Sequence, residues 1–269
     1  MPKSYFNLIE QSYSFPQEGF DLKSDYLTFH GISIKYLIEK YGTPFKLVYL
    51  PRIGEQIRTA KSLFNAAIKK HNYSGSYNYC YCTKCCHFSH VVKSALKESV
   101  HLETSSSFDI DLIFKLLEEG QLTKEITLIH NGYKTEDYLK KIIQLNKVGF
   151  KNSILVLDSK SELEKVKICT EGYTGKIKIG IRMAIDEEPQ SAYYTSRLGI
   201  RSSEILEFYK EEIAGNHKLS LKMIHFYIDS GIKDTVYYWG EFQKALKLFA
   251  ELKHVCPEIE AFNLGGGFP

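Results

Sequence analysis

The segment Tyr81–Cys86 combines residue types that suit covalent chemistry on an aldehyde. It overlaps the end of a run, Tyr77–Thr83, that we interpret as a β-strand. Because side chains alternate along a strand, Cys82 and Lys84 are expected on one face, with Lys84 at the carboxyl end. There, partial desolvation among sulfur and aromatic groups would lower the pKa of Lys84 and favour the neutral amine that condenses with an aldehyde. The alternative is an ordinary surface lysine that follows a buried strand.

The same segment allows a second interpretation, a metal site. Its candidate ligands are Cys80, Cys82, Cys85, Cys86, His87 and His90. Thiolate and imidazole groups bind zinc and iron–sulfur clusters. However, adjacent Cys85 and Cys86 point to opposite sides of an extended chain, and no second Cys/His pair follows at zinc-finger spacing. We therefore predict no metal and interpret the cysteines as small buried residues in a reducing compartment.

Two further segments could contact a planar, phosphorylated ligand. Ile224–Gly231 is predicted to be a strand end that carries an aromatic ring and a hydroxyl. Tyr227 there could pack on a ring and Ser230 could donate to a phosphate, whereas His225 taken singly is more often a core residue. Asn263–Phe268 contains three consecutive glycines whose backbone N–H groups could converge on an anion, namely Gly265, Gly266 and Gly267. A flexible turn would have the same sequence.

A fourth segment, Leu102–Asp109, indicates a strand end, a polar loop and a helix start. Ser107 is the expected N-cap, and capping accounts for most of the polar residues. Glu103 is the residue that capping does not explain. We expect its carboxyl group at the same strand ends as Lys84.

These residues need elements that bring their strand ends together. Predicted strands are Tyr77–Thr83, His101–Thr104, Ile126–Asn131, Ser153–Leu157, Lys176–Met183, Lys222–Ile228 and Phe262–Leu264. Predicted helices between them are Phe88–Glu98, Phe108–Glu119, Thr135–Leu145, Lys160–Lys167, Ser203–Tyr209 and Tyr237–Lys253. Strands that alternate with helices of this length indicate βαβ units and a parallel sheet. We predict an α/β fold, a TIM-type (β/α)8 barrel with about seven strands present, and keep a doubly wound open sheet as the alternative.

The two ends of the chain differ from this pattern. Residues 1–50 contain the strand-like pieces Tyr26–Phe29 and Phe45–Leu50 around a helix at Ile34–Tyr41, and helix Ile53–Lys70 then leads into the barrel. We predict two domains, 1–50 as an N-terminal segment and 51–269 as the barrel. A parallel barrel that lacks a strand has unpaired edges, so we expect the barrel to be truncated at its carboxyl end.

Composition excludes several classes of function. The formal net charge of +3 gives no concentrated basic patch, so we predict neither nucleic acid nor membrane as a partner. The N-terminus lacks the apolar core of a signal peptide, and no stretch reaches transmembrane length. We expect a cytoplasmic protein.

In their order along the chain, these segments resemble the pyridoxal-phosphate decarboxylases of the ornithine, diaminopimelate and arginine class, whose barrel is of the alanine racemase type. Tyr81–Cys86 resembles the family motif Tyr-Ala-x-Lys-Ala-Asn, and His225–Ser230 resembles His-x-His-x-Gly-Ser. Three other segments match family elements: Glu103–Ser106, Arg182 with Arg197–Gly199, and Gly265–Phe268. The resemblance covers nearly the whole chain after Ile53.

The resemblance implies a cofactor, pyridoxal 5'-phosphate, and a role for each matching residue. By resemblance Lys84 carries the cofactor, Tyr227 stacks on its ring, and Ser230 with Gly265–Gly267 binds its phosphate. Glu103 and Arg182 belong to the surrounding polar shell. Two positions depart from the motif, because Tyr227 stands where the family has histidine and Asp229 where it has glycine.

The resemblance also implies a reaction and partners. Asn131–Lys134 resembles a stretch typical of biosynthetic arginine decarboxylases, so we expect an enzyme that converts arginine to agmatine in polyamine biosynthesis. Its partners would be an amino-acid substrate and a second copy in a homodimer. Alternatives are a diaminopimelate or ornithine decarboxylase, a racemase or non-catalytic cofactor-binding barrel, and the cysteine-cluster metal protein. Residues 1–50 would contribute a strand to a β-rich domain, and the substrate-facing residues would lie beyond Pro269.

Overall fold

The computed structural model describes residues 18–23, 26–185, 198–228 and 235–266, and its chain divides into two compact units, residues 1–49 and 50–269. The first unit contains an antiparallel sheet in the order β1 (Phe20–Lys23), β2 (Tyr26–Phe29), β3 (Ile32–Ser33), followed by α2 (Ile34–Tyr41). Strand β2 and helix α2 were predicted, whereas β1 and β3 were not. The predicted strand at Phe45–Leu50 is wrong, because this run pairs with no described strand and Leu50 already begins the next helix.

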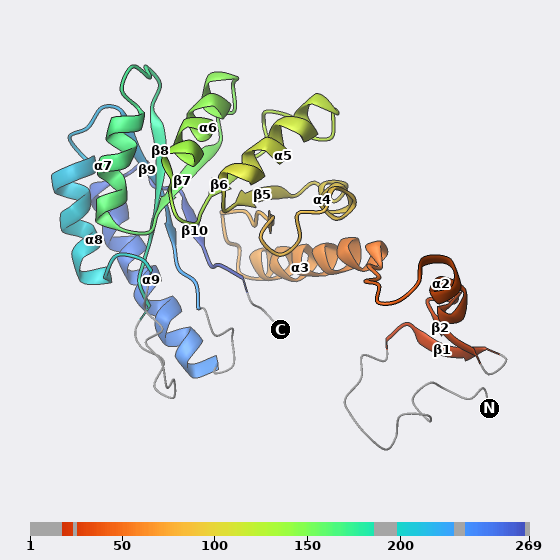
Figure 1. The fold of residues 1–269 in the computed structure, drawn as a ribbon. Coiled ribbons are helices and arrows are strands. Elements are labelled where there is room, and N and C mark those ends of the chain that lie inside the picture. Colours follow the sequence, from red (N-terminus) through yellow and green to blue (C-terminus); the bar gives the residue numbers. More distant parts are fainter. Residues whose placement is uncertain (1–17, 24–25, 186–197, 229–234, 267–269) are drawn as a thin grey trace. The chain divides into compact units, whose positions relative to one another are not determined.

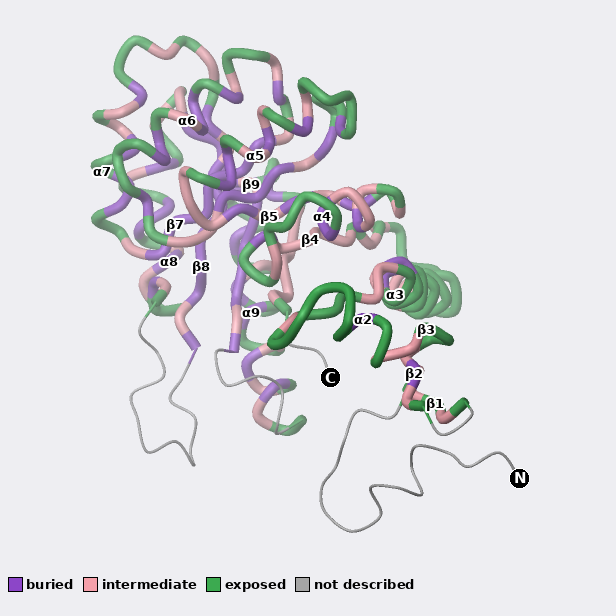
Figure 2. Tube along the Cα trace, turned by 45° about the vertical axis from the view of Figure 1, so that its right-hand side comes forward, coloured by how far each residue is buried: buried purple, intermediate pink, exposed green. Residues whose placement is uncertain are grey.

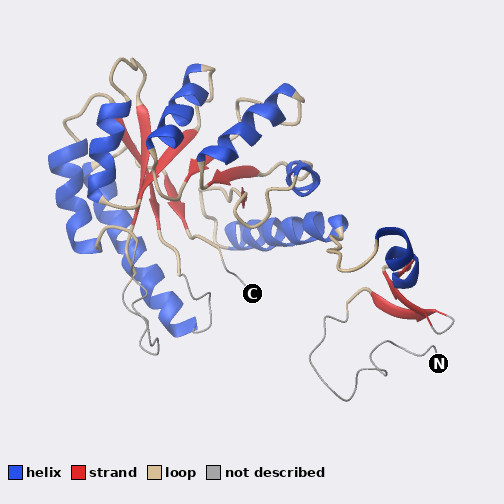
Figure 3. Ribbon diagram, in the orientation of Figure 1, coloured by secondary structure: helices blue, strands red, loops and turns tan. Residues whose placement is uncertain are grey.

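The second unit is built around a seven-stranded parallel sheet (Figures 1 and 3). Its strands are β4 (Cys80–Cys82), β5 (His101–Thr104), β6 (Leu128–His130), β7 (Ser153–Leu157), β8 (Ile177–Arg182), β9 (Leu219–His225) and β10 (Ala261–Asn263). Its helices are α3 (Leu50–Lys70), α4 (Ser89–Leu96), α5 (Ser107–Glu118), α6 (Glu136–Lys147), α7 (Lys160–Cys169), α8 (Ser202–Phe208) with the π-helical turn η1 (Tyr209–Ile213), and α9 (Thr235–Val255).

The order of the strands decides between the two predicted architectures. The described strands follow one another from β4 to β10 across the sheet, without a reversal of order. A doubly wound sheet reverses its strand order at a switch point and carries helices on both faces, so this alternative is excluded. The curled sheet with its helices along one side confirms the predicted incomplete barrel of about seven strands (Figure 1).

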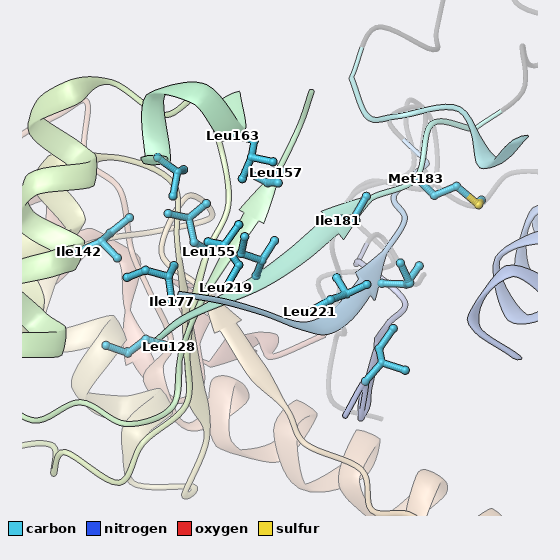
Figure 4. Close-up of a cluster of buried hydrophobic side chains, with 14 of the residues drawn as sticks. Leu128, Ile142, Leu155, Leu157, Leu163, Ile177, Ile181, Met183, Leu219 and Leu221 are labelled. Atoms are coloured by element: carbon cyan, nitrogen blue, oxygen red, sulfur yellow. The ribbon is translucent and has the colours of Figure 1, made fainter. Parts of the chain in front are cut away.

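Alternating side chains divide the core of this unit into two layers. Residues such as Leu155, Ile181 and Leu221 point from the sheet toward the helices and form the main apolar cluster (Figure 4). Val156, next to Leu155, belongs to a second, smaller cluster on the other side of the sheet. Met223 joins this cluster because a register shift between β8 and β9 inserts one extra residue after Leu221. The central strands β6 to β9 are buried almost throughout and the edge strands β4 and β10 only partly, while the outer sides of the helices are exposed (Figure 2). This two-sided burial fixes which strand residues point inward.

Local signals fix where the helices begin and hence where the loops lie. Helix α5 begins after Ser106, and a capping box joins Ser106 to Asp109, so the predicted cap at Ser107 is one residue too late. The Asp109 carboxylate accepts from the backbone N–H groups of Ser105 (2.8 Å) and Ser106 (3.1 Å), which holds the loop after β5 against the start of the helix. The carboxyl ends of β5, β6 and β7 therefore open onto short loops.

Candidate active site

Lys84 lies in a turn directly after β4. The turn is anchored to the neighbouring strand, because the backbone N and the Oγ1 of Thr83 both donate to the carbonyl oxygen of Glu103, at 2.9 and 3.1 Å. Lys84 therefore lies beyond the end of the strand, and the Lys84 side chain is exposed. The predicted position at the carboxyl end of the strand is therefore found, but the predicted partial burial of the side chain is wrong.

Two cationic groups lie near one aromatic ring at this end of the barrel. The Nζ of Lys84 is 5.6 Å from the centre of the Tyr227 ring, and the Cζ of Arg182 is 5.8 Å from the same centre. Both separations are within the range of cation–π attraction. Arg182 ends β8 and pairs in register with His225, two residues before Tyr227. Three residues predicted from separate strands thus meet at one place.

Glu103 is the fourth predicted residue at this place. Burial raises the pKa of its carboxyl group, and hydrogen bonds from Asn131 and Asn263 together with the positive charge of Lys84 oppose the increase. The Nδ2 of Asn131 lies 3.3 Å from a carboxyl oxygen of Glu103. An acid with a raised pKa beside a lysine is the kind of pair that binding sites use.

The amide of Asn131 also contacts His225, and this pairing was not predicted. Its Nδ2 lies 3.2 Å from the Nε2 of His225, which is 2 % exposed. Burial, assisted by the charge of Arg182, lowers the pKa of His225 to about 3, so the ring is neutral. Because the Asn131 amide donates to Nε2, the ring proton is on Nδ1. This Nδ1 is buried and forms no hydrogen bond among the described residues, while Asn263 beside the ring opposes part of the decrease in its pKa.

The glycine-rich turn after β10 is the predicted phosphate site. Gly265 has φ +70°, and a Cβ atom there would lie 2.7 Å from the carbonyl oxygen of Phe226. A Cβ on Gly266 would meet nothing within 4 Å, so the backbone there borders open space. The N–H of Gly265 donates to the Oδ1 of Asn263 at 2.8 Å, so the open side of the turn lies at Gly266. Two other predicted phosphate contacts, Ser230 and Gly267, lie outside the described residues.

Arg182 is part of a network of buried charged side chains. Glu162 on α7 accepts from the backbone N–H groups of Lys134 (3.0 Å) and Asp158 (2.8 Å). The Nζ of Lys134 lies 3.7 Å from Glu162, and a guanidinium nitrogen of Arg182 lies 3.6 Å from Asp158. Burial lowers the pKa of Lys134, and the neighbouring charge of Glu162 opposes that effect. This network was not predicted, and its one signal in the sequence is the family resemblance of residues 131–134.

The structure also bears on the metal interpretation of the cysteine cluster. Within the described residues, no three histidine, cysteine or acidic side chains are grouped so that they could hold a metal ion. Burial raises the pKa of Cys80 and of Cys82 to about 12, the nearby Glu103 charge adding to the effect, so both are protonated thiols. Metal ions bind the thiolate form.

In the described part of the chain, no helix is both long and apolar enough to span a bilayer.

Comparison with known families and proteins gives one family match over most of the chain. The family model described as "Pyridoxal-dependent decarboxylase, pyridoxal binding domain" matches residues 53–269. The biosynthetic arginine decarboxylase 2 of Synechocystis sp. is 24 % identical over 244 residues, which cover 85 % of this chain and 37 % of that protein. The biosynthetic arginine decarboxylase of Shewanella frigidimarina is 26 % identical over 234 residues, or 82 % of this chain and 36 % of that protein.

Solved structures show the same fold. The biosynthetic arginine decarboxylase of Campylobacter jejuni superimposes with a TM-score of 0.69 at 24 % identity, over 93 % of this chain and 42 % of that one. A diaminopimelate decarboxylase of M. jannaschii in complex with L-lysine gives a TM-score of 0.73 at 19 % identity, over 93 % and 57 %. The chain thus spans about a third of the length of these curated relatives. The predicted family, its pyridoxal cofactor and its decarboxylase class are confirmed.

Proposed function

Because this chain belongs to the family of pyridoxal-dependent decarboxylases, we propose that its barrel binds pyridoxal phosphate and that Lys84 is the residue that carries it. The observation that most supports this assignment is the approach of Lys84 and Arg182 to the ring of Tyr227 at the carboxyl ends of the strands. When bound, the cofactor supplies an electron sink for the carbanion left after a carboxyl group departs. The protein would orient the substrate's reacting bond and hold the protons that the reaction needs.

Tyr227 would hold the ring of the cofactor, and the glycine turn would hold its phosphate. The Tyr227 ring offers an apolar face for stacking, as an imidazole would, but it carries no positive charge beside the substrate. The phosphate would bind at the turn Gly265–Gly267 together with Ser230. Because the Gly265 N–H already donates to the Oδ1 of Asn263, the backbone N–H of Gly266 is the proposed donor in the described part of this turn. The open space at Gly266 supports the assignment.

Glu103 and Arg182 would form the polar shell around the reacting atoms. Burial raises the pKa of the Glu103 carboxyl group, and the charge of the Lys84 amine is among the effects that oppose the increase. Arg182 keeps a fixed positive charge at the mouth, because Asp158 pairs with it from the buried side. His225 adds an Nδ1–H donor whose partner is absent from the described residues. Together these groups can orient a carboxylate and an amine.

For the substrate we propose arginine, converted to agmatine in polyamine biosynthesis. The Asn-Gly-Tyr-Lys stretch at 131–134 and the printed names of the curated relatives support this choice. Diaminopimelate and ornithine remain alternatives, and a diaminopimelate decarboxylase is among the structural neighbours. Release of CO2 from each of the three amino acids, measured on a protein of the relatives' full length, distinguishes them. Absence of release from all three would favour a racemase or a non-catalytic carrier. A homodimer belongs to the same proposal, and light scattering of that protein tests it.

The cofactor assignment has a test that needs no turnover. The 269-residue chain is incubated with pyridoxal phosphate, reduced with cyanoborohydride, and mapped by peptide mass. We expect a phosphopyridoxyl label on Lys84, no such label in Lys84→Ala, and an unchanged label in the control Lys97→Ala, whose lysine is also exposed. A folded Lys84→Ala chain that keeps the label would refute the assignment.

A further inference from the structure

The turn that carries Lys84 begins and ends with a cysteine. In the order Cys82-Thr83-Lys84-Cys85, the backbone N of Cys85 donates to the carbonyl oxygen of Cys82 at 3.1 Å. The α-carbons at the two ends of such a turn lie less than about 7 Å apart. Disulfides join α-carbons that are about 4.4–6.8 Å apart. The spacing of Cys82 and Cys85 therefore suits a disulfide. No disulfide is present, since all six cysteines are free thiols in the structure.

Both flanks of the turn are fixed to the barrel. Thr83 is hydrogen-bonded through its N and its Oγ1 to the carbonyl oxygen of Glu103 on the neighbouring strand. On the other side, the hydroxyl of Tyr81 donates to the carbonyl oxygen of Cys86 at 2.9 Å. These bonds hold the two ends of the turn opposite each other, which lowers the entropic cost of joining them.

The two other pairs that are nearest in sequence are less favourable. Cys85 and Cys86 are adjacent, and a disulfide between neighbours strains the peptide bond that joins them. Cys80 and Cys82 are two residues apart on β4, so their α-carbons are about 6.6 Å apart and their side chains leave the strand in parallel. The turn therefore favours the pair Cys82–Cys85.

We propose that Cys82 and Cys85 form a reversible disulfide, by exchange with a small disulfide such as oxidised glutathione, and that this bond restrains the lysine between them. In the first step a Cys85 thiolate, having released its proton to water, attacks one sulfur of glutathione disulfide and releases one glutathione thiolate. In the second, Cys82 loses its proton, attacks the Cys85 sulfur and releases the second glutathione. The protein loses two protons and two electrons, and glutathione disulfide takes them up to become two thiols.

The environment of the two thiols sets this order. Cys85 is exposed and can meet a solute, whereas Cys82 is partly buried on the inner side of β4. Burial, with the Glu103 charge as a smaller cause, raises the pKa of Cys82 to about 12, so its attack is the slow step. A mixed disulfide at Cys85 is therefore the expected intermediate, and it should precede the internal bond.

The consequence for Lys84 rests on the proposed function. In the reduced turn the Lys84 amine lies 5.6 Å from the centre of the Tyr227 ring. Drawing the two sulfurs to bonding distance requires both cysteine side chains to rotate, and it fixes the backbone on each side of the lysine. The closed turn should hold the amine away from the position in which it meets the cofactor. Oxidation should thus decrease cofactor attachment.

The test uses the whole 269-residue chain equilibrated in mixtures of reduced and oxidised glutathione. Non-reducing peptide mass mapping reports which cysteines are joined, and phosphopyridoxyl labelling of Lys84 by cyanoborohydride, which leaves disulfides intact, reports attachment. We expect a Cys82–Cys85 peptide in the oxidised chain, labelling that is several-fold lower, and recovery of both after dithiothreitol. The matched control Cys86→Ser should behave like the parent chain, and Cys85→Ser should keep its labelling under oxidation.

Each other outcome contradicts a defined part of the proposal. A bond between a different pair, or none at a potential that oxidises exposed thiols, would overturn the disulfide itself. A Cys82–Cys85 bond with unchanged labelling would overturn its effect on Lys84. If the reduced chain is not labelled at all, the proposed cofactor role of Lys84 fails, while the mass map still decides whether the disulfide forms.

Discussion

Gly265 shows how one residue shapes the candidate phosphate turn. Its φ of +70° is unfavourable for side chains, and a Cβ would lie 2.7 Å from the carbonyl oxygen of Phe226. We expect Gly265→Ala to lower the free energy of unfolding by about 2 kcal/mol or more, from backbone strain and contact together. Urea denaturation followed by circular dichroism measures the change.

The neighbouring glycine provides the matched control. Gly266 has no strained φ, and a Cβ there would meet nothing within 4 Å. Gly266→Ala should therefore unfold like the parent chain, but its methyl group would occupy the space that we assign to the phosphate. We expect weaker binding of pyridoxal phosphate in a fluorescence titration. Equal destabilisation by both variants would mean that the turn is not constrained as the structure shows.

For single residues, the sequence predicted where side chains lie better than it predicted which side chains contact each other. Lys84, Glu103 and Tyr227 could be placed because each stands at the end of a predicted strand, where barrels bind ligands. The contact between Asn131 and His225 joins residues 94 positions apart. It depends on the curvature of the sheet, which no local pattern specifies. His225 was therefore interpreted as an ordinary core residue.

Among the elements, helix α7 contributes most to holding the loops at the barrel mouth. Its Glu162 accepts from the backbone N–H groups that follow β6 and β7, and it is the ion-pair partner of the fully buried Lys134. Removing the carboxylate leaves a buried ammonium group without its counter-charge. We expect Glu162→Ala to lower the free energy of unfolding by about 3–5 kcal/mol, as measured by urea denaturation.

The control for this variant lies two residues along the same helix. Glu164 pairs with Lys167 at the surface, and its side chain is 66 % exposed. Pairs of this kind contribute little in water, so Glu164→Ala should change the free energy of unfolding by less than about 0.5 kcal/mol. Similar effects of the two substitutions would contradict the assignment of Glu162 as the anchor of both loops.

The elements themselves were largely predictable, and their errors have physical causes. Helix α2 and the strands β5 and β7 were predicted to the residue, because clear polar boundaries enclose each run. Strand β9 was predicted at Lys222–Ile228 but spans Leu219–His225. The apolar character continues past the last paired residue, since Phe226 and Ile228 are buried without being in the strand. Burial and strand pairing are separate properties, and composition reports only burial.

The molecule as a whole should lose stability in mild acid because it buries two neutral histidines. His130 is fully buried between Thr104 and Ser153, and burial lowers its pKa to about 3, as it does for His225. Between that value and the ordinary 6.5, the unfolded chain binds protons that the folded chain does not. Stability from each histidine is therefore complete above 6.5 and falls as the pH decreases, by about 2 kcal/mol between pH 7 and pH 5.

Glu103 acts in the opposite direction, since its raised pKa means that the folded chain takes up a proton first, and this offsets part of the loss. The free energy of unfolding, measured by urea denaturation at a series of pH values, should decrease toward pH 5. The decrease should be about half as steep in His130→Gln, which keeps polar atoms but cannot titrate. Replacing the exposed His254 by Gln should leave the slope unchanged. If His130→Gln retained the full slope, the acid sensitivity would have to come from groups other than the buried histidines.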